Sequence, residues 1–223
     1  MTSLPFMPSR EGMPDGHLVE RRLSGEKLLH GRFLEAWRDT VELPDGVTST
    51  REYLVHPGAV VIVPLIETPD GFKVVIERQY RYPVQQVMVE FPAGKLEPGE
   101  RIYDCAWREL LEETGYRAAE WARAGTMHPV ISYSTEFIDI WFARGLSLGE
   151  RSLDEGEFLD VEQVSPEQLL EWCREGRVTD AKTMTCMLWL QNWLSGGWPL
   201  HWRRAEQCDA EETPPPASGK FGE

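Results

Sequence analysis

Acidic side chains follow Gly94 at spacings that could hold a metal ion. Glu100 comes after five intervening residues, and Glu109, Glu112 and Glu113 come after a further stretch without Gly or Pro. On an α-helix, residues three and four apart lie on one face, so the last three carboxylates would crowd together and repel. A hard cation such as Mg²⁺ or Mn²⁺ would remove that repulsion, because it takes carboxylate oxygens and keeps positions for water and phosphate oxygens.

The residues around these acids predict a helix with one buried face. A Pro-Gly turn at 98–99 precedes it, and Gly115 stands where a helix C-terminal cap is expected. Ile102, Ala106 and Leu110 recur every four residues and would form the apolar face. That stripe is widened by Cys105, Trp107 and Leu111. The alternative is an exposed acidic helix whose glutamates are only solvated.

The whole stretch resembles the signature of the Nudix hydrolase family at every specified position. That signature reads Gly, five residues, Glu, seven residues, Arg-Glu, an apolar residue, any residue, Glu-Glu, any residue, Gly and an apolar residue, and this chain matches it from Gly94 to Tyr116. The resemblance implies the α/β class, with a Nudix α/β/α sandwich and a mixed sheet. It also implies an enzyme that hydrolyses a nucleoside diphosphate linked to another group, with two to three Mg²⁺ or Mn²⁺ ions per site.

The resemblance assigns roles to residues of this signature, which is called the Nudix box (Gly94 to Tyr116). Glu109 and Glu113 would be the principal metal ligands and catalytic acids, and Glu112 would add a third carboxylate. Arg108 and Glu100 would not bind the metal themselves but would orient the acids that do. The metal ligands that the resemblance implies are the backbone carbonyl of Ala93 and the carboxylates of Glu109, Glu112, Glu113 and Glu157.

A second acidic run, at 153–158, could supply the group that activates water. Two acids flank a glycine ahead of a predicted strand, which is typical of a mobile loop. By the resemblance, Glu155 would be the catalytic base and Glu157 would touch a metal ion. The alternative is a solvated acidic loop.

Outside the box, residues 78–81 and 90–94 are similar to the ADP-ribose pyrophosphatase and nucleoside-diphosphate-sugar branch of the family, and this similarity extends over about 17–191. It implies that Arg51 and Arg81 contact the diphosphate or terminal ribose, and that Glu90 lies beside the metals. A planar guanidinium can take two phosphate oxygens at once. Surface ion pairs are the alternative for both arginines. With ADP-ribose as substrate, the products would be AMP and ribose 5-phosphate.

Aromatic residues near the N-terminus could stack on a nucleobase. Phe33 and Trp37 present flat rings suited to this, although core or interface packing would suit them equally. In this branch the N-terminal sheet is typically exchanged between two subunits. The N-terminal segment has too few apolar residues to form a core of its own. The resemblance therefore implies a homodimer in which the partner subunit supplies that core.

The run 128–136 resembles the substrate loop of ADP-ribose-selective proteins, with Ser134 and Glu136 in place. Such proteins usually carry proline sixteen residues beyond the box glycine, and that position here is Ile131; the nearest proline is Pro129. Selectivity could therefore extend to sugar nucleotides such as ADP-glucose, GDP-mannose and UDP-glucose. An ordinary Pro-containing turn is the alternative for this loop.

Composition limits the partners of the chain. Its 223 residues carry a net charge of −14 with a pI near 4.9, which argues against nucleic-acid grooves and anionic membrane surfaces. The partner we expect is therefore a small nucleoside diphosphate derivative. The cysteines lack CxxC spacing, and neither a secretory segment nor a long apolar run is visible, which favours a reduced, cytoplasmic protein. Free cysteines would follow at positions 105, 173, 186 and 208.

The pattern along the chain predicts four segments: a mobile N-terminus at 1–16, a β dimerisation unit at 17–55, a catalytic domain at 56–204 and a disordered acidic, Pro-rich tail at 205–223. The first β segment reads as a small antiparallel sheet. In the catalytic domain, strands are expected at 58–66, 72–79, 137–143 and 158–164, and helices at 166–176 and 181–194.

Two other classes of function remain open. Some Nudix domains bind nucleotide derivatives without cleaving them, but these have usually lost an acid of the box, and all are retained here. A hydrolase that removes 5′ diphosphate groups from RNA would need a basic approach surface, which a charge of −14 disfavours.

Overall fold

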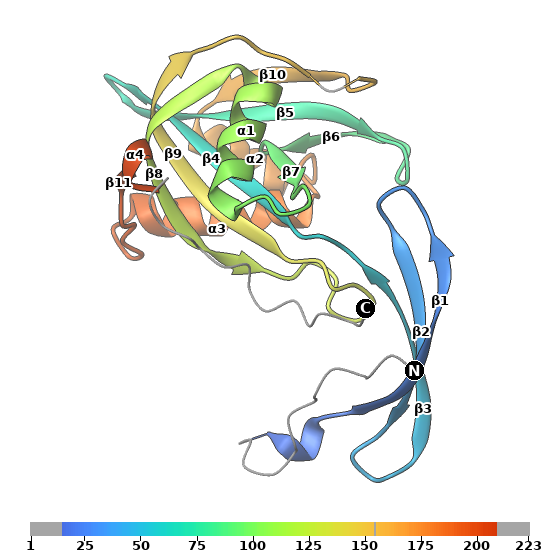
Figure 1. Ribbon diagram of the computed structural model, residues 1–223. Coiled ribbons are helices and arrows are strands. Elements are labelled where there is room, and N and C mark those ends of the chain that lie inside the picture. The colour runs from blue at the N-terminus through green and yellow to red at the C-terminus, as the bar shows by residue number, and fades with distance from the viewer. Residues whose placement is uncertain (1–14, 154, 209–223) are drawn as a thin grey trace. The chain divides into compact units, whose positions relative to one another are not determined.

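The computed structural model describes residues 15–153 and 155–208 (Figure 1). The described chain divides into two compact units, one made of 15–56 with 130–136 and the other of 57–129 with 137–208. In this part of the chain, no helix has both the length and the apolar character needed to span a membrane.

The first unit is a three-stranded antiparallel sheet in the order β1-β2-β3, which confirms the antiparallel sheet predicted near the N-terminus. A 3₁₀ turn, Gly16–Leu18, precedes it. The strands are β1 Arg21–His30, β2 Glu35–Glu42 and β3 Thr48–Val55. A Pro-Asp-Gly turn joins β2 to β3, and there the amide of Val47 donates to Asp45 Oδ1 at 3.0 Å.

Residues 130–136 belong to this first unit although they come late in the sequence. The amide of Leu54 in β3 donates to the Tyr133 carbonyl at 2.8 Å, and the amide of Thr135 donates back to the Leu54 carbonyl at 3.0 Å. Backbone hydrogen bonds therefore hold the predicted substrate loop on the last strand of the small sheet.

The second unit contains an eight-stranded mixed sheet. Its main path runs β10-β5-β4-β9-β8-β11, while β6 pairs with β5 and β7 pairs with β4. The parallel pair is β4 with β9, and the other pairs are antiparallel. The strands are β4 Ala59–Thr68, β5 Gly71–Arg81, β6 Gln86–Glu90, β7 Ala93–Lys95, β8 Tyr116–Met127, β9 Ile138–Leu148, β10 Leu159–Val164 and β11 Arg203–Arg204.

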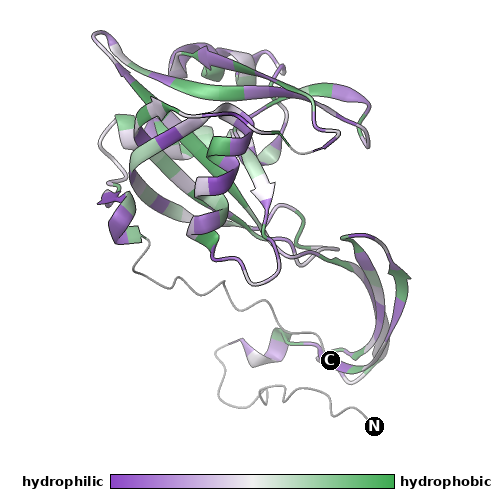
Figure 2. Ribbon diagram, turned by 45° about the horizontal axis from the view of Figure 1, so that its top comes forward, coloured by the Kyte–Doolittle hydropathy of each residue, from purple (hydrophilic) through white to green (hydrophobic). Residues whose placement is uncertain are grey.

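Helices cover both faces of this sheet, and the alternation of side chains along β4 shows why. Val61 and Val63 point into the core beneath α2 and α3, whereas Val60 and Ile62 point into the core beneath α1. Apolar residues accordingly follow the central strands between the helices (Figure 2). The predicted α/β/α sandwich with a mixed sheet is confirmed.

The helices of this unit are α1 Ile102–Thr114, α2 Pro166–Arg174, α3 Ala181–Leu194 and α4 Ala205–Cys208. Helix α3 has the predicted bounds, and α2 begins as predicted but ends two residues early. Ser165 caps α2, because its side chain accepts a hydrogen bond from the Gln168 amide.

Two expectations about the chain need correction, and one long strand was missed. Strand β8 was not predicted, because the sequence around Arg117 and Arg123 does not show a regular alternation of apolar and polar residues. Trp107, placed in the apolar stripe, is 38 % exposed. Residues 205–208 do not begin a disordered tail: they form α4, whose Cys208 is buried in the α1 core. The rest of the predicted tail and residues 1–14 lie outside the described residues.

Candidate active site

Helix α1 presents the box acids on the face turned away from the core. Ile102, Ala106 and Leu110 are buried against the sheet, as the sequence predicted. Gly115 ends the helix in the left-handed conformation at φ 74°, and its amide donates to the Leu111 carbonyl. The apolar stripe thus fixes the rotation of the helix, and that rotation decides where the acids point.

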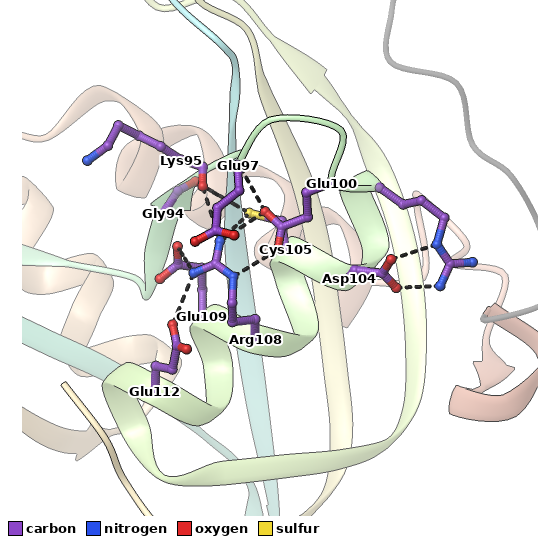
Figure 3. A network of polar contacts seen from close by, with 10 residues as sticks. Gly94, Lys95, Glu97, Glu100, Asp104, Cys105, Arg108, Glu109 and Glu112 are labelled. Carbon is purple, nitrogen blue, oxygen red and sulfur yellow. Dashed lines mark hydrogen bonds and ion pairs between the residues drawn. The ribbon is translucent and has the colours of Figure 1, made fainter. Parts of the chain in front are cut away.

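Arg108 connects the acids of the box (Figure 3). Its Nε donates to Glu100 Oε1 at 2.8 Å and its Nη2 to Glu100 Oε2 at 3.0 Å. Its Nη1 donates to Glu109 Oε1 at 2.7 Å and to Glu112 Oε2 at 3.0 Å. The guanidinium therefore reduces the charge repulsion expected between the carboxylates on this helix, and it is positioned to orient Glu109.

Strand β7 brings the backbone before the box against the helix. Gly94 lies beside the carboxylate of Glu109, and a Cβ atom at position 94 would come within 1.8 Å of that group. The amide of Ala93 donates to Glu113 Oε2 at 2.9 Å. The structure therefore brings Ala93, Glu109 and Glu113 together, whereas Glu112 lies outward with its side chain 31 % exposed.

Burial and mutual repulsion make these acids hard to ionise. Burial raises the pKa of Glu109 to about 7, although Arg108 opposes the shift, and Glu112 and Glu157 add to it. For Glu113, burial and then the charges of Glu77, Glu109 and Glu157 hold the pKa well above its ordinary value.

Strand β5 carries further polar groups to the same place. Burial and then the charges of Glu90 and Glu157 raise the pKa of Glu77 to about 8. Two residues on, Gln79 donates through Nε2 to Glu157 Oε1 at 3.0 Å. Because side chains alternate along a strand, Glu77, Gln79 and Arg81 share one face.

A buried carboxylate on β6 is paired with two cations. Arg81 donates to both oxygens of Glu90, at 2.8 and 2.9 Å, and Lys182 of α3 also donates to Glu90. Burial alone would raise the pKa of Glu90, but these partners outweigh it and lower the pKa. Lys182 contacts Asp180 as well, at 3.1 Å. The predicted residues Arg81 and Glu90 are therefore partners of each other beside the acidic group.

The loop before β10 separates the two predicted acids. Glu157 is half-buried and interacts electrostatically with Glu77, Glu109 and Glu113. Glu155 is exposed in a turn next to position 154, which lies outside the described residues. The structure thus places Glu157 with the helix acids and leaves Glu155 at the surface.

The donor set fits divalent cations. Glu77, Glu109, Glu113 and Glu157 are oxygen donors that repel one another, and Oε1 of Glu77 is buried without a hydrogen-bond partner. Hard cations prefer carboxylate and carbonyl oxygens, and they would cancel this repulsion. Among the described residues, no group of three or more His, Cys, Asp or Glu side chains is already arranged so that it could hold a metal ion. Two of these carboxylates are instead hydrogen-bonded within the protein, Glu109 to Arg108 and Glu113 to the Ala93 amide.

Four predicted substrate residues lie in the first unit. Trp37 has Arg22 and Lys27 over its ring, at 5.7 and 5.2 Å from the centroid, and its indole donates to Glu35. Arg51 pairs with Glu20 and lines a cavity of about 280 Å³. The Trp37 ring is therefore engaged by its own sheet.

The same cavity includes part of the predicted substrate loop. Its wall contains Ile131 and Ser134, and the Ser134 hydroxyl accepts a hydrogen bond from the Glu136 amide at 3.1 Å. Glu136 lies 4.0 Å from His56 Nε2. The structure thus groups Arg51 with Ser134.

A second cavity, of about 240 Å³, lies in the larger unit and contains none of the predicted site residues. It is lined by Tyr103, Trp121, Arg123, Trp141, His201, Arg203 and Cys208.

Sequence reasoning missed several members of the site. Glu77 and Gln79 lie within the strand predicted at 72–79, and the sequence contained a signal for them. Glu77 interrupts an apolar run, and it lies two positions before Gln79 and four before Arg81, on the same side of the strand. Asp180 and Lys182 flank the start of α3, where a capping Asp is ordinary. Nothing local distinguishes Lys182 from a surface lysine.

Comparison with known proteins agrees with this geometry. The NUDIX domain family model matches residues 55–185. The chain is 39 % identical over 176 residues to the methanol dehydrogenase activator of Bacillus methanolicus, covering 77 % of this chain and 92 % of that protein. It is 38 % identical over 176 residues to the ADP-ribose pyrophosphatase of Bacillus subtilis, covering 78 % and 94 %.

A solved structure has the same fold. The crystal structure of an ADP compounds hydrolase superposes with a TM-score of 0.71 at 23 % identity, covering 79 % of this chain and 95 % of that one. The family model spans most of the larger unit, including the helix that carries the box acids. The chain therefore belongs to the Nudix family.

Proposed function

We propose that this chain hydrolyses the diphosphate bond of ADP-ribose and releases AMP and ribose 5-phosphate. The observation that carries the proposal is the group of carboxylates formed by buried Glu113 and partly buried Glu109 and Glu157, with the guanidinium of Arg81 beside it. The similarity to an ADP-ribose pyrophosphatase along 94 % of that protein's length supports the choice of substrate.

Metal ligands come from three elements. Glu109 and Glu113 on α1, Glu157 before β10 and the backbone carbonyl of Ala93 would hold two to three Mg²⁺ or Mn²⁺ ions, with Glu112 as a further ligand. Bound cations would spread the charge of the diphosphate, lower the pKa of a coordinated water and stabilise the leaving phosphate oxygen.

The protein's own groups position these ligands. Arg108 binds Glu109 while Glu100 holds the other side of its guanidinium, so the Glu109 carboxylate has a fixed direction. Arg81 is held by Glu90 near Glu113, and in this proposal its guanidinium contacts the diphosphate.

Glu155 acts as the base. Its carboxylate takes a proton from the attacking water, the water oxygen forms a bond to phosphorus, and the bond from that phosphorus to the bridging oxygen breaks. The electron pair stays on the departing phosphate. Its place in an exposed turn lets Glu155 approach the substrate when the loop moves.

The first unit supplies a substrate subsite in this proposal. Arg51 and Ser134 line one cavity and contact the terminal ribose or the diphosphate, while Glu136 fixes Ser134. Trp37 stacks on the adenine in this proposal, on the ring over which Arg22 and Lys27 now lie.

The chain works as a homodimer in this proposal. Nine of the ten β1 residues are exposed, and Leu23, Leu28 and Leu29 are among them, so this sheet has apolar surface for a partner to cover. Light scattering should give twice the chain mass of 25.6 kDa. A monomer with full activity would contradict the exchange of the sheet.

One observation favours broader specificity. Ile131, at the position where ADP-ribose-selective proteins carry proline, lines the cavity with Arg51 and Ser134 and is 83 % exposed. With isoleucine in place of the proline ring, this part of the cavity wall has a different shape, and sugar nucleotides are therefore the second candidate substrates.

A single assay decides between them. Purified protein with Mg²⁺ is given ADP-ribose, ADP-glucose, GDP-mannose or UDP-glucose, and the phosphate esters released are quantified. A kcat/KM for ADP-ribose at least tenfold above the others supports the proposal. Equal values support the broader pyrophosphatase, and no release from any of them rules out both.

A further inference from the structure

One carboxylate outside the Nudix box is buried beside it without a partner. Glu77 of β5 is 2 % exposed, and its Oε1 has no hydrogen-bond partner. A buried polar atom without a partner is unfavourable, and a buried charge is more so. Such a group in a folded enzyme points to something that binds it.

The strand direction shows where Glu77 points. Successive side chains on a strand alternate, so Glu77, Gln79 and Arg81 emerge on the same face of β5. Gln79 reaches Glu157 and Arg81 reaches Glu90, both of which belong to the site. Glu77, the deepest of the three, therefore faces the same acidic group, and its charge interacts with those of Glu113 and Glu157.

Glu90, the neighbour of Glu77 on the adjacent strand, shows how a buried carboxylate is ordinarily satisfied by positively charged partners. Glu90 lies opposite Glu77 in the β5–β6 register. Two cations, Arg81 and Lys182, satisfy Glu90. The described residues give Glu77 Oε1 no comparable donor, although the two carboxylates are equally buried. Structural ion pairing thus accounts for Glu90 and leaves Glu77 unexplained.

We propose that Glu77 is an additional cation ligand, supplied by β5 to the site that Glu109, Glu113 and Glu157 form. This inference rests on the proposed function, because it concerns the same cations. Oxygen-only coordination suits Mg²⁺ and Mn²⁺, and a ligand on a strand is held more rigidly than one on the 153–158 loop.

The competing explanation is that Glu77 retains a proton and only hydrogen-bonds Glu113. The two explanations differ in cation affinity. A ligand contributes directly to cation binding, whereas a neutral carboxylic acid can be replaced by an amide without loss of binding.

The experiment compares Glu77→Gln with wild type in Mn²⁺ binding, followed by electron paramagnetic resonance of free Mn²⁺, and in thermal unfolding with EDTA or Mn²⁺. Glu67→Gln, an exposed glutamate on β4, is the matched control. We expect Glu77→Gln to weaken Mn²⁺ binding at least tenfold and to lose most of the Mn²⁺-induced rise in Tm, while its Tm in EDTA is no lower than that of wild type. Glu67→Gln should match wild type in both.

Unchanged Mn²⁺ affinity in folded Glu77→Gln would overturn the inference. If that variant does not fold, Glu77→Met, which needs no hydrogen-bond partner, decides by the same criteria. The wild-type result separates this failure from that of the proposed function. Wild type that neither binds Mn²⁺ nor hydrolyses substrate refutes the proposed function, whereas wild type that does both, beside an equally tight Glu77→Gln, refutes only the role of Glu77.

Discussion

The α-carbon of Gly94 lies so close to the carboxylate of Glu109 that any side chain at position 94 would displace this carboxylate. A Cβ atom at position 94 would stand 1.8 Å from Glu109 Cδ and Oε1. The φ of Gly94 lies outside the left-handed region, so backbone conformation does not demand glycine there. The close approach does, because the box glycine makes room for the acid fifteen positions later.

Gly94→Ala should therefore displace Glu109 while the fold persists. A shift of about 1 Å in a catalytic group costs about 100-fold in rate, so we expect kcat with ADP-ribose to fall by about that factor. Steady-state kinetics and circular dichroism check this. Gly197→Ala is the control, since a Cβ at Gly197 meets only ordinary contacts of 3.5 Å or more. A Gly94→Ala enzyme within twofold of wild type would refute this account.

Glu113→Gln tests the central acid. The Gln amide oxygen can still accept the Ala93 hydrogen bond, and the buried charge is gone, so stability in EDTA should not fall. Turnover should drop by at least about 1000-fold, because a ligand for the cations is lost. Kinetics at saturating Mg²⁺ and a thermal melt measure both. Turnover within tenfold of wild type would defeat the assignment of Glu113.

Arg81→Ala should cost both stability and substrate affinity. Glu90 is 4 % exposed in its side chain, and removing Arg81 takes away two of its hydrogen bonds. We expect a loss of about 1–3 kcal/mol, since Lys182 remains as a partner and Arg81 is itself 41 % exposed. Denaturant unfolding measures the loss, and KM for ADP-ribose should rise at least tenfold.

Arg78→Ala on the same strand is the control for Arg81. Its side chain pairs with Glu162 at 3.3 Å at the surface, and both groups are more than one-third exposed. Such pairs contribute about 0–1 kcal/mol, so stability and KM should hardly change. Equal effects of the two substitutions would show that Arg81 has no special role.

The sequence predicted the catalytic helix and the core strands well, because periodicity and caps are local signals. Ile102, Leu110 and Gly115 have the places that their spacing implied, and the two helices after Ser165 begin as expected. These features depend on residues within one element.

Features that depend on tertiary packing could not be predicted in the same way. Glu77 and Lys182 are distant in sequence, and only the β5–β6 pairing and the packing of α3 bring both to Glu90 and its neighbours. The neutralisation of Glu112 by Arg108 was also missed, because repulsion was inferred from helix spacing without the arginine on the same face.

Metal-free protein should lose stability as pH rises. Glu109 and Glu77 have folded pKa values of about 7 and about 8, above the ordinary value of 4.5. Between 4.5 and those values the folded state binds more protons than the unfolded state, so the free energy of unfolding falls with rising pH. Thermal melts in EDTA from about pH 5 to 8 should show a declining Tm.

Two comparisons check that pH dependence. Glu109→Gln should flatten the decline, because one of the titrating groups is gone, and saturating Mg²⁺ should reduce it in wild type, because the cations bind the ionised acids. A Tm in EDTA that stays constant or rises over this range would contradict the raised pKa values.

Replacing the two acids of the 153–158 loop, Glu155 and Glu157, should affect the kinetics in different ways. Glu155→Gln removes the base and should lower kcat by about 100-fold or more, with the Mg²⁺ concentration at half-maximal rate unchanged. Glu157→Gln removes a carboxylate that faces Glu109 and Glu113, so it should raise that Mg²⁺ concentration severalfold or more. Rates measured over a Mg²⁺ series separate the two effects. If Glu157→Gln instead lowers kcat at saturating Mg²⁺ while Glu155→Gln matches wild type, the base is Glu157, the acid that the structure already places against the helix.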